Sequence, residues 1–575
     1  MASSFETTLF PIVQTINEYL SNYVLVILLL GVGIWYTIKM RCVQVRCFKE
    51  GWNRVFGNIT LNGKKGGTGM SSFQALATAI AAQVGTGIIV GVAGAILTGG
   101  PGAVFWMWVI SFFGMATIYA EATLAQETRI VELDGTIKGG PVYYITTAFK
   151  GKFGKFLAGF FAVAITLALG FMGCMVQSNS IGEACQNAFH IPSWVMGLIV
   201  SAIAAFIFIG GVQRIASVTE KIVPVMACLY LVGGLIVLFA RIRYVPETFG
   251  MIFKYAFVPQ SIIGGGIGYA LKTAISQGAK RGLFSNEAGM GSTPHAHALA
   301  NVKSPHEQGT VAMIGVFIDT FVVLTMTALV VISTLYAGNG PLAHGAVDGI
   351  SKTNMAQLAF SSVFGDTLGN AFVAICLLFF AFSTIVGWNL FGRINVNYLF
   401  GKKANLAYSI IAIIFIGAFK PDIFIANLTT GADPSLAFVD QVQTAMMVTI
   451  WVFIGIEGAV AISGRAKKAK DVGKATIIAF ICVLTLYLTV SILSMGVMPL
   501  SELANLENPA LAYVMQAAVG DWGAVLINFA VSLSLIGAML GYTVLASESP
   551  FEAAEEGVFI RAFAKTNDKG APVVT

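Results

Sequence analysis

Long runs of apolar residues recur from one end of the chain to the other, separated by short polar or charged segments. Each run has about the 20 residues that an α-helix needs to cross a hydrocarbon layer of roughly 30 Å. The pattern predicts about 13 spanning helices, and we therefore expect an all-α polytopic membrane protein. The predicted ranges are 20–39, 72–98, 101–127, 156–180, 193–212, 222–240, 260–279, 308–336, 368–392, 404–420, 441–463, 475–497 and 519–548.

The composition supports a membrane location. Of the 575 residues, 56% are hydrophobic and only 11% are Asp, Glu, Lys or Arg, whereas a soluble globular chain carries about 25% charged residues. So few charges cannot cover the surface of a soluble body of this size. The composition therefore excludes a soluble enzyme, a nucleic-acid-binding protein and a disordered chain, and it makes the lipid bilayer the expected partner of the surface.

Lysine and arginine positions predict the direction of the chain across the membrane. The first 19 residues contain neither, while the loop after the first apolar run contains seven. Cytoplasmic loops collect positive charge, so the N-terminus is expected outside and this loop inside. With alternating spans, 28 of the 34 positive residues fall in cytoplasmic segments, and the C-terminus is cytoplasmic as well. The net charge of +6 is thus a topology signal rather than evidence for an acidic partner.

Several motifs of catalysis and cofactor binding are missing from the sequence. There is no G-x-x-x-x-G-K-[ST] nucleotide-binding loop, no H-E-x-x-H motif, and no cysteine and histidine set with the spacing of a metal or haem site. We therefore expect no enzymatic activity and no cofactor, and ATP-driven transport is disfavoured. A transporter driven by an ion gradient fits the sequence better.

Two apolar runs carry glycines that would interrupt a helix near the middle of the membrane. The first is Ala81–Gly91, with three glycines in seven residues, and the second is the Gly264–Gly268 run that leads to Ile275–Gly278. The two runs lie five spans apart, which suits an inverted repeat of five plus five helices. The alternative is that these glycines only let helices pack closely.

A broken helix also suggests a ligand. Free N–H groups at the start of a half-helix bind a carboxylate, and free carbonyl groups bind an ammonium group or a cation. The residues alone thus favour a small zwitterion or anion, with or without a cation.

Four segments resemble the alanine or glycine:cation symporter family over about residues 10–415. They are Gly99–Gly114, Gly139–Tyr144, Arg281–Ser292 and Phe382–Trp388. The resemblance implies the five-plus-five inverted-repeat amino-acid transporter fold, preceded by one extra N-terminal helix. It also implies import of alanine or glycine with Na⁺ or H⁺ as the coupling ion, in a bacterial inner membrane.

The resemblance implies a substrate pocket with residues from four helices. These residues are Thr86, Gly87, Gln177, Ile275, Ser276, Gly278, Thr384 and Trp388. Thr384 and Trp388 lie four positions apart and so share one helix face, where Trp388 would cap a small substrate. Two alternatives stay open: Trp388 anchors its helix at the membrane interface, and Gln177 only joins two helices by a hydrogen bond.

The same resemblance implies a Na⁺ site. Its ligands would be the carbonyl groups of Ala81 and Val84 and the hydroxyl groups of Ser383 and Thr384. One position departs from the family, which usually has Asn where this chain has Ile88. If that Asn holds the helix break, Ile88→Asn should raise uptake or its dependence on Na⁺.

Charged residues inside apolar runs are costly and often functional. Glu121, Lys272, Asp319 and Glu457 meet this description and are candidates for coupling or gating. The alternative for each is a structural ion pair or a side chain that reaches the membrane surface.

The C-terminal part changes resemblance near residue 420. Trp451–Ala459, Arg465–Thr476 and Gly537–Ser549 resemble helices six to eight of basic amino-acid antiporters of the arginine/ornithine type. The resemblance implies gating and coupling roles for Trp451 and Glu457, although no first broken helix of an antiporter precedes them. We therefore expect a hybrid chain. Its predicted parts are the extra helix and basic loop over 1–70, the symporter core over 71–420, and three antiporter-like helices with a tail over 421–575.

The leading hypothesis is import of alanine or glycine by alternating access, coupled to Na⁺ or H⁺. A second hypothesis is an amino-acid exchanger whose C-terminal part gives selectivity for basic amino acids. A third is a fusion protein that folds without transporting anything. The expected partners are a small amino acid, Na⁺ or H⁺, and the bilayer, with no nucleic acid.

Overall fold

The computed structural model forms two compact units, Thr15–Gly417 and the set of Met1–Gln14 with Ala418–Thr575. The boundary lies close to residue 420, where the resemblance changes. Each unit is described by itself. The structure describes residues 15–17, 19–57, 69–133, 136–257, 267–343, 349–352, 354–418, 423, 427, 469–567 and 572–574.

Helices and one short hairpin are the regular elements in the described part of the larger unit. Its first half contains the π-helix η1 (Leu20–Val24), α2 (Leu25–Lys39), α3 (Val43–Arg46), α4 (Phe48–Phe56), α5 (Ser72–Gln83), the π-helix η2 (Gly87–Gly91), α6 (Val92–Gly99), α7 (Ala103–Glu127), α8 (Pro141–Ala148), α9 (Gly151–Ile165), the π-helix η3 (Thr166–Gly173), α10 (Cys174–Phe189), α11 (Ser193–Ile209) and α12 (Gly211–Ala240). Strands β1 (Ile130–Val131) and β2 (Ile137–Lys138) pair in antiparallel fashion between α7 and α8.

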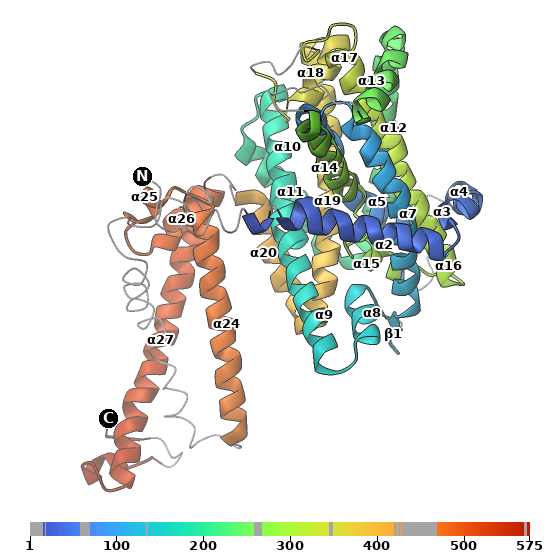
Figure 1. The fold of residues 1–575 in the computed structure, drawn as a ribbon. Helices are drawn as coiled ribbons and strands as arrows, with labels where there is room; N and C mark the ends of the chain where they lie inside the picture. The colour runs from blue at the N-terminus through green and yellow to red at the C-terminus, as the bar shows by residue number, and fades with distance from the viewer. Residues whose placement is uncertain are drawn as a thin grey trace. The chain divides into compact units, whose positions relative to one another are not determined.

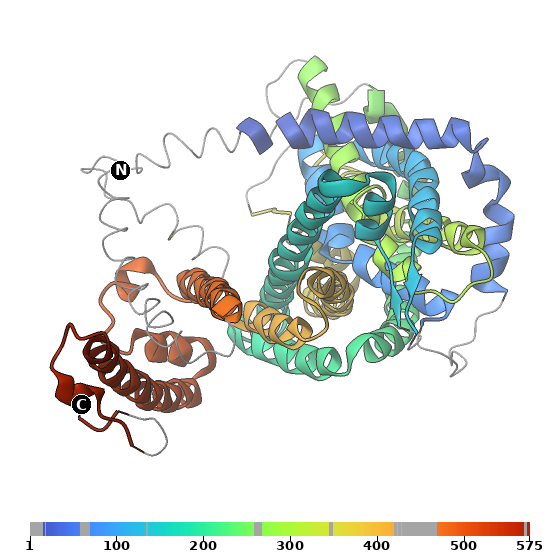
Figure 2. The same cartoon turned by 90° about the horizontal axis from the view of Figure 1, so that it is seen from below.

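The second half of this unit is also helical in its described part. It contains the 3₁₀ helix η4 (Ile242–Tyr244), α13 (Val245–Phe257), α14 (Ile267–Asn286), α15 (Pro294–Ala298), α16 (Pro305–Val316), the π-helix η5 (Phe317–Leu324), α17 (Thr325–Leu335), α18 (Met355–Phe364), α19 (Asp366–Phe400) and α20 (Ala404–Ala418). Figure 2, seen from below, shows α19 within the ring of the other helices.

The described residues contain fewer helices of membrane-spanning length than the sequence predicts. Among the described residues, six helices are long and apolar enough to cross a membrane, or seven if the pair Ser72–Gln83 and Gly87–Gly99, bent by 47°, counts as one span. The predicted 13 spans are therefore not confirmed. The span expected over 260–279 is described only from Ile267, where α14 (Ile267–Asn286) begins. The span expected over 441–463 lies outside the described residues.

The extra N-terminal helix lies on the outside of the larger unit. Figures 1 and 2 both show α2 crossing the long helices rather than running along them. It packs on α7 at Gly33, where a β-carbon would come within 2.9 Å of the Phe113 β-carbon. Since α2 has 15 residues, it is an apolar helix below the length of the spanning candidates.

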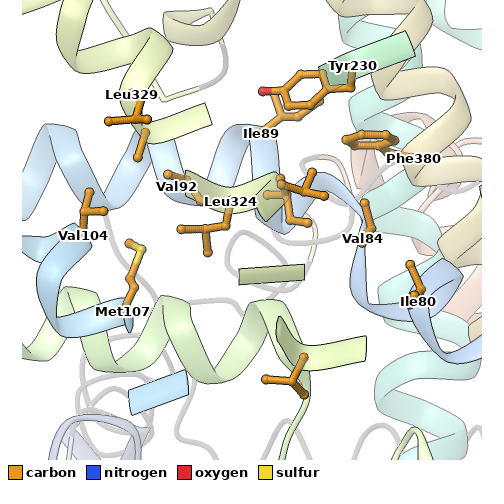
Figure 3. Packing of buried hydrophobic residues seen from close by; sticks show 14 of the residues in the cluster. Ile80, Val84, Ile89, Val92, Val104, Met107, Tyr230, Leu324, Leu329 and Phe380 are labelled. Atoms are coloured by element: carbon orange, nitrogen blue, oxygen red, sulfur yellow. The ribbon is translucent and has the colours of Figure 1, made fainter. Parts of the chain in front are cut away.

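The main hydrophobic core surrounds the bent pair of helices. Ile80 of α5 and Val84, just after its end, lie on one side of the bend, and Ile89 and Val92 follow it (Figure 3). Tyr230 of α12 packs against Phe380 of α19 in the same cluster, with ring centroids 5.2 Å apart. The first arm, α5, thus packs on α12 and α19, and the second arm, α6, packs on α14 and α17.

The smaller unit contains four α-helices in its described part, α24 (Ala469–Met495), α25 (Leu500–Leu503), α26 (Ala510–Val519) and α27 (Asp521–Glu555), followed by the 3₁₀ helix η7 (Arg561–Ala564). The two long helices cover most of the spans predicted over 475–497 and 519–548. Asn427 joins the end of α24 to α25, because its amide donates to the Met495 and Met498 carbonyls and accepts from the Leu500 N–H. The gating candidates Trp451 and Glu457 lie outside the described residues.

Candidate functional site

The first predicted helix break is present. Helix α5 begins with a capping box between Ser71 and Gln74 and ends at Gln83. Val84 leaves helical geometry with φ −83° and ψ 69°, and the helix resumes as η2 at Gly87. The carbonyl groups of the last turn of α5 are therefore available to other partners.

Gly85 allows two other helices to reach this break. A β-carbon at Gly85 would lie 2.5 Å from the Thr384 hydroxyl oxygen on α19 and 3.1 Å from the amide atoms of Gln177 on α10. Separations under 3.0 Å do not occur for real β-carbons. The close approach of α19 therefore depends on glycine at this position.

Three of the four predicted Na⁺ ligands come together at this point. The Thr384 hydroxyl donates to the Ala81 carbonyl over 2.8 Å, and the Ser383 hydroxyl lies 3.4 Å from the same carbonyl. Both side chains are fully buried. Val84 follows Ala81 at the end of α5. Hydroxyl and carbonyl oxygens are the neutral ligands that suit a hard cation, although the role of these four residues as ligands stays a prediction.

Two predicted substrate residues also meet here. The Gln177 side-chain oxygen accepts a hydrogen bond from the Thr86 backbone N–H over 3.1 Å, and both residues are buried. At the neighbouring Gly87, a β-carbon would meet nothing within 4 Å. The backbone just past the break therefore borders open space, as a pocket for a small substrate requires.

The second predicted break lies at the Gly264–Gly268 run, and the structure describes this part of the chain only from Ile267 onward. Ile275, Ser276 and Gly278 lie inside the continuous helix α14, which runs to Asn286. Gly278 lets α14 pack on α7, because a β-carbon there would lie 2.5 Å from the Ala103 carbonyl oxygen. The helix-packing alternative therefore holds for Gly278, and the substrate roles of all three residues stay predictions. Residues 264–266 lie outside the described part.

An interruption that the sequence did not predict follows α14, at residues 287–293, and we call it the second break. Three residues of this segment have left-handed backbone angles, Glu287 (φ 55°), Gly289 (φ 86°) and Gly291 (φ 72°). Helix α15 then resumes at Pro294, whose ring suits a first helical position. This break falls within Arg281–Ser292, one of the four segments that carry the resemblance.

Glu121 of α7 holds the second break in place. Its two carboxylate oxygens accept hydrogen bonds from the N–H groups of Gly289 and Gly291, over 2.9 and 3.1 Å. The candidate residue thus has backbone partners rather than a Lys272 partner. Lys272 is exposed on α14, with its ammonium group 5.3 Å from the centre of the Tyr23 ring.

Trp388 joins the second break to α19. Its indole N–H donates to one carboxylate oxygen of Glu287 over 2.7 Å, and the Ser292 hydroxyl donates to the other over 2.5 Å. The Trp388 ring lies against Gly173 of η3, where a β-carbon would lie 2.4 Å from a ring atom. An indole bonded to a buried carboxylate is not a membrane-interface anchor, so that alternative fails.

Sequence reasoning missed Glu287 as a functional candidate. The residue is 1% exposed, and both of its carboxylate oxygens are hydrogen-bonded. The available signal was an acidic residue inside an otherwise uncharged stretch with two nearby glycines, Gly289 and Gly291. Such a residue is expensive to bury unless it has partners.

Asp319 of η5 lies beside the end of α14. Its Oδ2 atom accepts hydrogen bonds from the hydroxyl groups of Ser285 and Thr320, over 2.9 and 3.0 Å. The structure thus gathers the ends of α5 and α14, the middle of α19 and one acidic residue of η5 in one buried region.

Comparison with known proteins gives a consistent result. The model of the sodium:alanine symporter family matches residues 6–454, and the model named amino acid permease matches residues 346–575. The second match agrees with the change of resemblance in the C-terminal part.

Three relatives show how far the similarity extends. The sodium/alanine symporter AgcS of Methanococcus maripaludis is 38% identical over 410 residues, covering 71% of this chain and 88% of that protein. The amino-acid carrier protein AlsT of Bacillus subtilis is 38% identical over 398 residues, covering 69% and 80%. A Bacillus subtilis protein named as a probable sodium/glutamine symporter is 39% identical over 393 residues, covering 68% and 78%.

The family match covers more than half of the chain and includes both helix breaks, Glu121, Asp319 and the Ser383–Trp388 segment. The relatives are transporters, and the helices of the larger unit have the lengths of a multi-pass membrane protein. The chain belongs to the sodium:alanine symporter family and is a transporter rather than an enzyme.

Proposed function

We propose that this protein imports alanine or glycine, coupled to Na⁺ or H⁺, by alternating access across a bacterial inner membrane. The N-terminus is outside and the C-terminus in the cytoplasm, as the distribution of Lys and Arg indicates. The observation that carries the proposal is the meeting of the Ser383 and Thr384 hydroxyl groups with the Ala81 carbonyl at the end of broken α5. Na⁺ is the favoured coupling ion because each of these groups offers an uncharged oxygen atom as a ligand.

The surroundings of the break favour a small substrate. Thr86 and Gln177 are joined by a hydrogen bond beside the open space at Gly87. Trp388 fills the space against Gly173, at the level of Glu287. A bulky ring fixed in this position leaves little room for a large side chain. Relatives named for alanine and for glutamine make glutamine the competitor to test against alanine and glycine.

Uptake into proteoliposomes tests the proposal. Labelled alanine, glycine, glutamine and arginine are supplied with an inward Na⁺ gradient, with an inward H⁺ gradient, and with neither. We expect alanine and glycine to accumulate only with a cation gradient. Accumulation of glutamine in preference to both would overturn the proposed substrate.

A matched pair of threonine variants locates the coupling ion. Thr384→Ala removes a proposed ligand, and each 1.4 kcal/mol lost raises the half-saturating Na⁺ concentration about tenfold. Thr147 is an exposed threonine of α8 whose hydroxyl donates to the carbonyl four residues earlier. Thr147→Ala should leave the Na⁺ response of uptake unchanged. If both substitutions changed the Na⁺ response of uptake equally, Thr384 would not be a ligand of the coupling ion.

The two other hypotheses predict different results in the same assay. An exchanger would take up arginine against internal amino acid without any cation gradient. A fusion protein without a transport cycle would show no flux of any substrate.

A further inference from the structure

A second group of buried polar side chains lies between the two helix breaks, apart from the proposed ligands at Ala81 and Thr384. We name it the Asp319 cluster. Its members are Gln83, Ser111, Ser285, Asn286, Asp319 and Thr320, from α5, α7, α14 and η5. Every member is at most 4% exposed.

Asn286 is the centre of the cluster. Its side-chain N–H₂ donates to the hydroxyl oxygens of Ser111 and Thr320, over 2.8 and 3.3 Å. Its side-chain oxygen accepts from the Ala288 N–H at the start of the second break. Its backbone carbonyl accepts from the Gln83 amide over 2.7 Å. The last residue of α14 is thus tied directly to the last residue of α5.

Two oxygens in this cluster have no hydrogen-bond partner, Asp319 Oδ1 and Gln83 Oε1. Because the Gln83 side-chain nitrogen donates to the Asn286 carbonyl, the side-chain oxygen Oε1 is the atom without a partner. Gln83 Oε1 lies 3.8 Å from the place of a β-carbon on Gly315, about one helical turn before Asp319. Buried oxygens without partners are rare in folded proteins and point to a missing ligand or ion.

The two acids at the second break differ from Asp319. Glu121 and Glu287 each use both carboxylate oxygens as acceptors. Arg281, the basic group of α14 closest to the cluster in sequence, has its side chain beside Gly91. Among the described residues Asp319 makes no ion pair. A buried carboxylate with one free oxygen and no counter-charge is strongly unfavourable by itself.

We propose that Asp319 and Gln83 form a second cation site, which takes one monovalent cation, Na⁺ or a proton, for each substrate transported. Sodium would find a carboxylate oxygen, an amide oxygen and neighbouring hydroxyl groups, all of them ligands of hard cations. A proton on Asp319 would supply a donor where only acceptors are now present. Either cation cancels the same charge. Because the cluster ties α5 to α14, its occupancy would hold the two breaks together.

This inference rests on the proposed function, and the charge carried per alanine separates the two. Alanine is a zwitterion without net charge, so two cations carry two charges per molecule. The membrane potential that balances a known alanine gradient in proteoliposomes gives this number. We expect two for the natural sequence, and a value of one would overturn the second site while leaving symport intact. Repeating the measurement with Na⁺ or pH equal on both sides distinguishes Na⁺ from a proton.

The variant Asp319→Asn tests the residue. It removes the charge, keeps the shape and offers an N–H donor, so it imitates the occupied site. We expect one charge per alanine rather than two, with exchange of labelled for unlabelled alanine retained. Asp366→Asn, at an exposed aspartate that begins α19, is the matched control and should keep two charges.

A binding measurement keeps the inference testable if no transport is seen. The melting temperature of the purified natural protein should rise with Na⁺ or with falling pH. The Asp319→Asn variant should have a higher melting temperature than the natural protein in Na⁺-free buffer. Adding the identified cation should raise its melting temperature by at most about half as much as it raises that of the natural protein. An unchanged response in this variant would overturn the second site, whether or not the protein transports alanine.

Discussion

The absence of one β-carbon, at Gly85, lets α19 and α10 meet the end of α5. Gly85→Ala would place a carbon 2.5 Å from the Thr384 hydroxyl oxygen, which has to move away from the Ala81 carbonyl. Overpacking of this kind costs about 1–3 kcal/mol. We expect the half-saturating Na⁺ concentration for alanine uptake to rise roughly tenfold or more. Gly159→Ala, on α9 with nothing within 4 Å, is the control. Normal uptake by Gly85→Ala would contradict the placement of Thr384.

Trp388 gives a second prediction at the same scale. Trp388→Phe keeps a ring against Gly173 but removes the donor to Glu287. A buried acceptor left without its partner costs about 1–3 kcal/mol, so we expect a lower melting temperature and weaker alanine uptake. Trp35→Phe, at an exposed position of α2, should change neither. If Trp388 acts only through its ring face, the Phe variant will transport normally.

Ile88 shows what the sequence could reveal about single residues and what it could not. Its departure from the family pattern is visible in the sequence. The structure adds that Ile88 is fully buried within the main apolar cluster. Ile88→Asn would therefore bury an amide group, which costs about 1–3 kcal/mol of stability without partners. This loss of stability opposes any gain in uptake. Burial of this kind depends on α14, η5 and α18, which contact η2 and lie far away in the chain.

At the scale of elements, the sequence predicts the first break correctly and does not predict the break at residues 287–293. Glycines near Gly85 and Gly87 mark the first break because the chain there leaves helical geometry. Glycine at 278 has the same appearance in the sequence but serves contact between α14 and α7. The difference lies in the partner helix, which a local pattern cannot show. The acidic residue that stabilises the second break, Glu121, lies 168 residues from Gly289.

Glu121→Gln tests how the second break is held. Glutamine has one acceptor oxygen, so one of the N–H groups of Gly289 and Gly291 loses its partner. We expect a loss of about 1–3 kcal/mol in stability. Backbone amides of residues 287–293 should exchange hydrogen faster, as measured on peptides of this segment. Glu127→Gln, at the exposed end of α7, is the control. Equal exchange in the two variants would contradict a holding role for Glu121.

At the scale of the whole molecule, charge and hydropathy are enough to recognise a multi-pass membrane protein, because they depend only on the order of residues. They do not show where one compact unit ends, since positive charges alternate regularly on both sides of residue 420. The change of resemblance does indicate a boundary there, and the structure divides between Gly417 and Ala418. The described residues of the candidate site all belong to the unit Thr15–Gly417.

Two truncations test whether that unit is sufficient for transport. A chain ending at Lys420 keeps α20, whose Ile416 carbonyl accepts from Ser178 of α10 over 2.7 Å. A chain ending at Phe400 loses this bond and Tyr408, which is 3% exposed and packs on Gly170. We expect the chain ending at Lys420 to fold and to accumulate alanine to within about twofold of the level reached by the full chain. The chain ending at Phe400 should neither fold nor accumulate alanine. Loss of arginine exchange in the first, with alanine uptake absent from the full chain, would instead support the exchanger. If the first truncation folds but transports nothing while the full chain transports alanine, the C-terminal unit is part of the transport cycle.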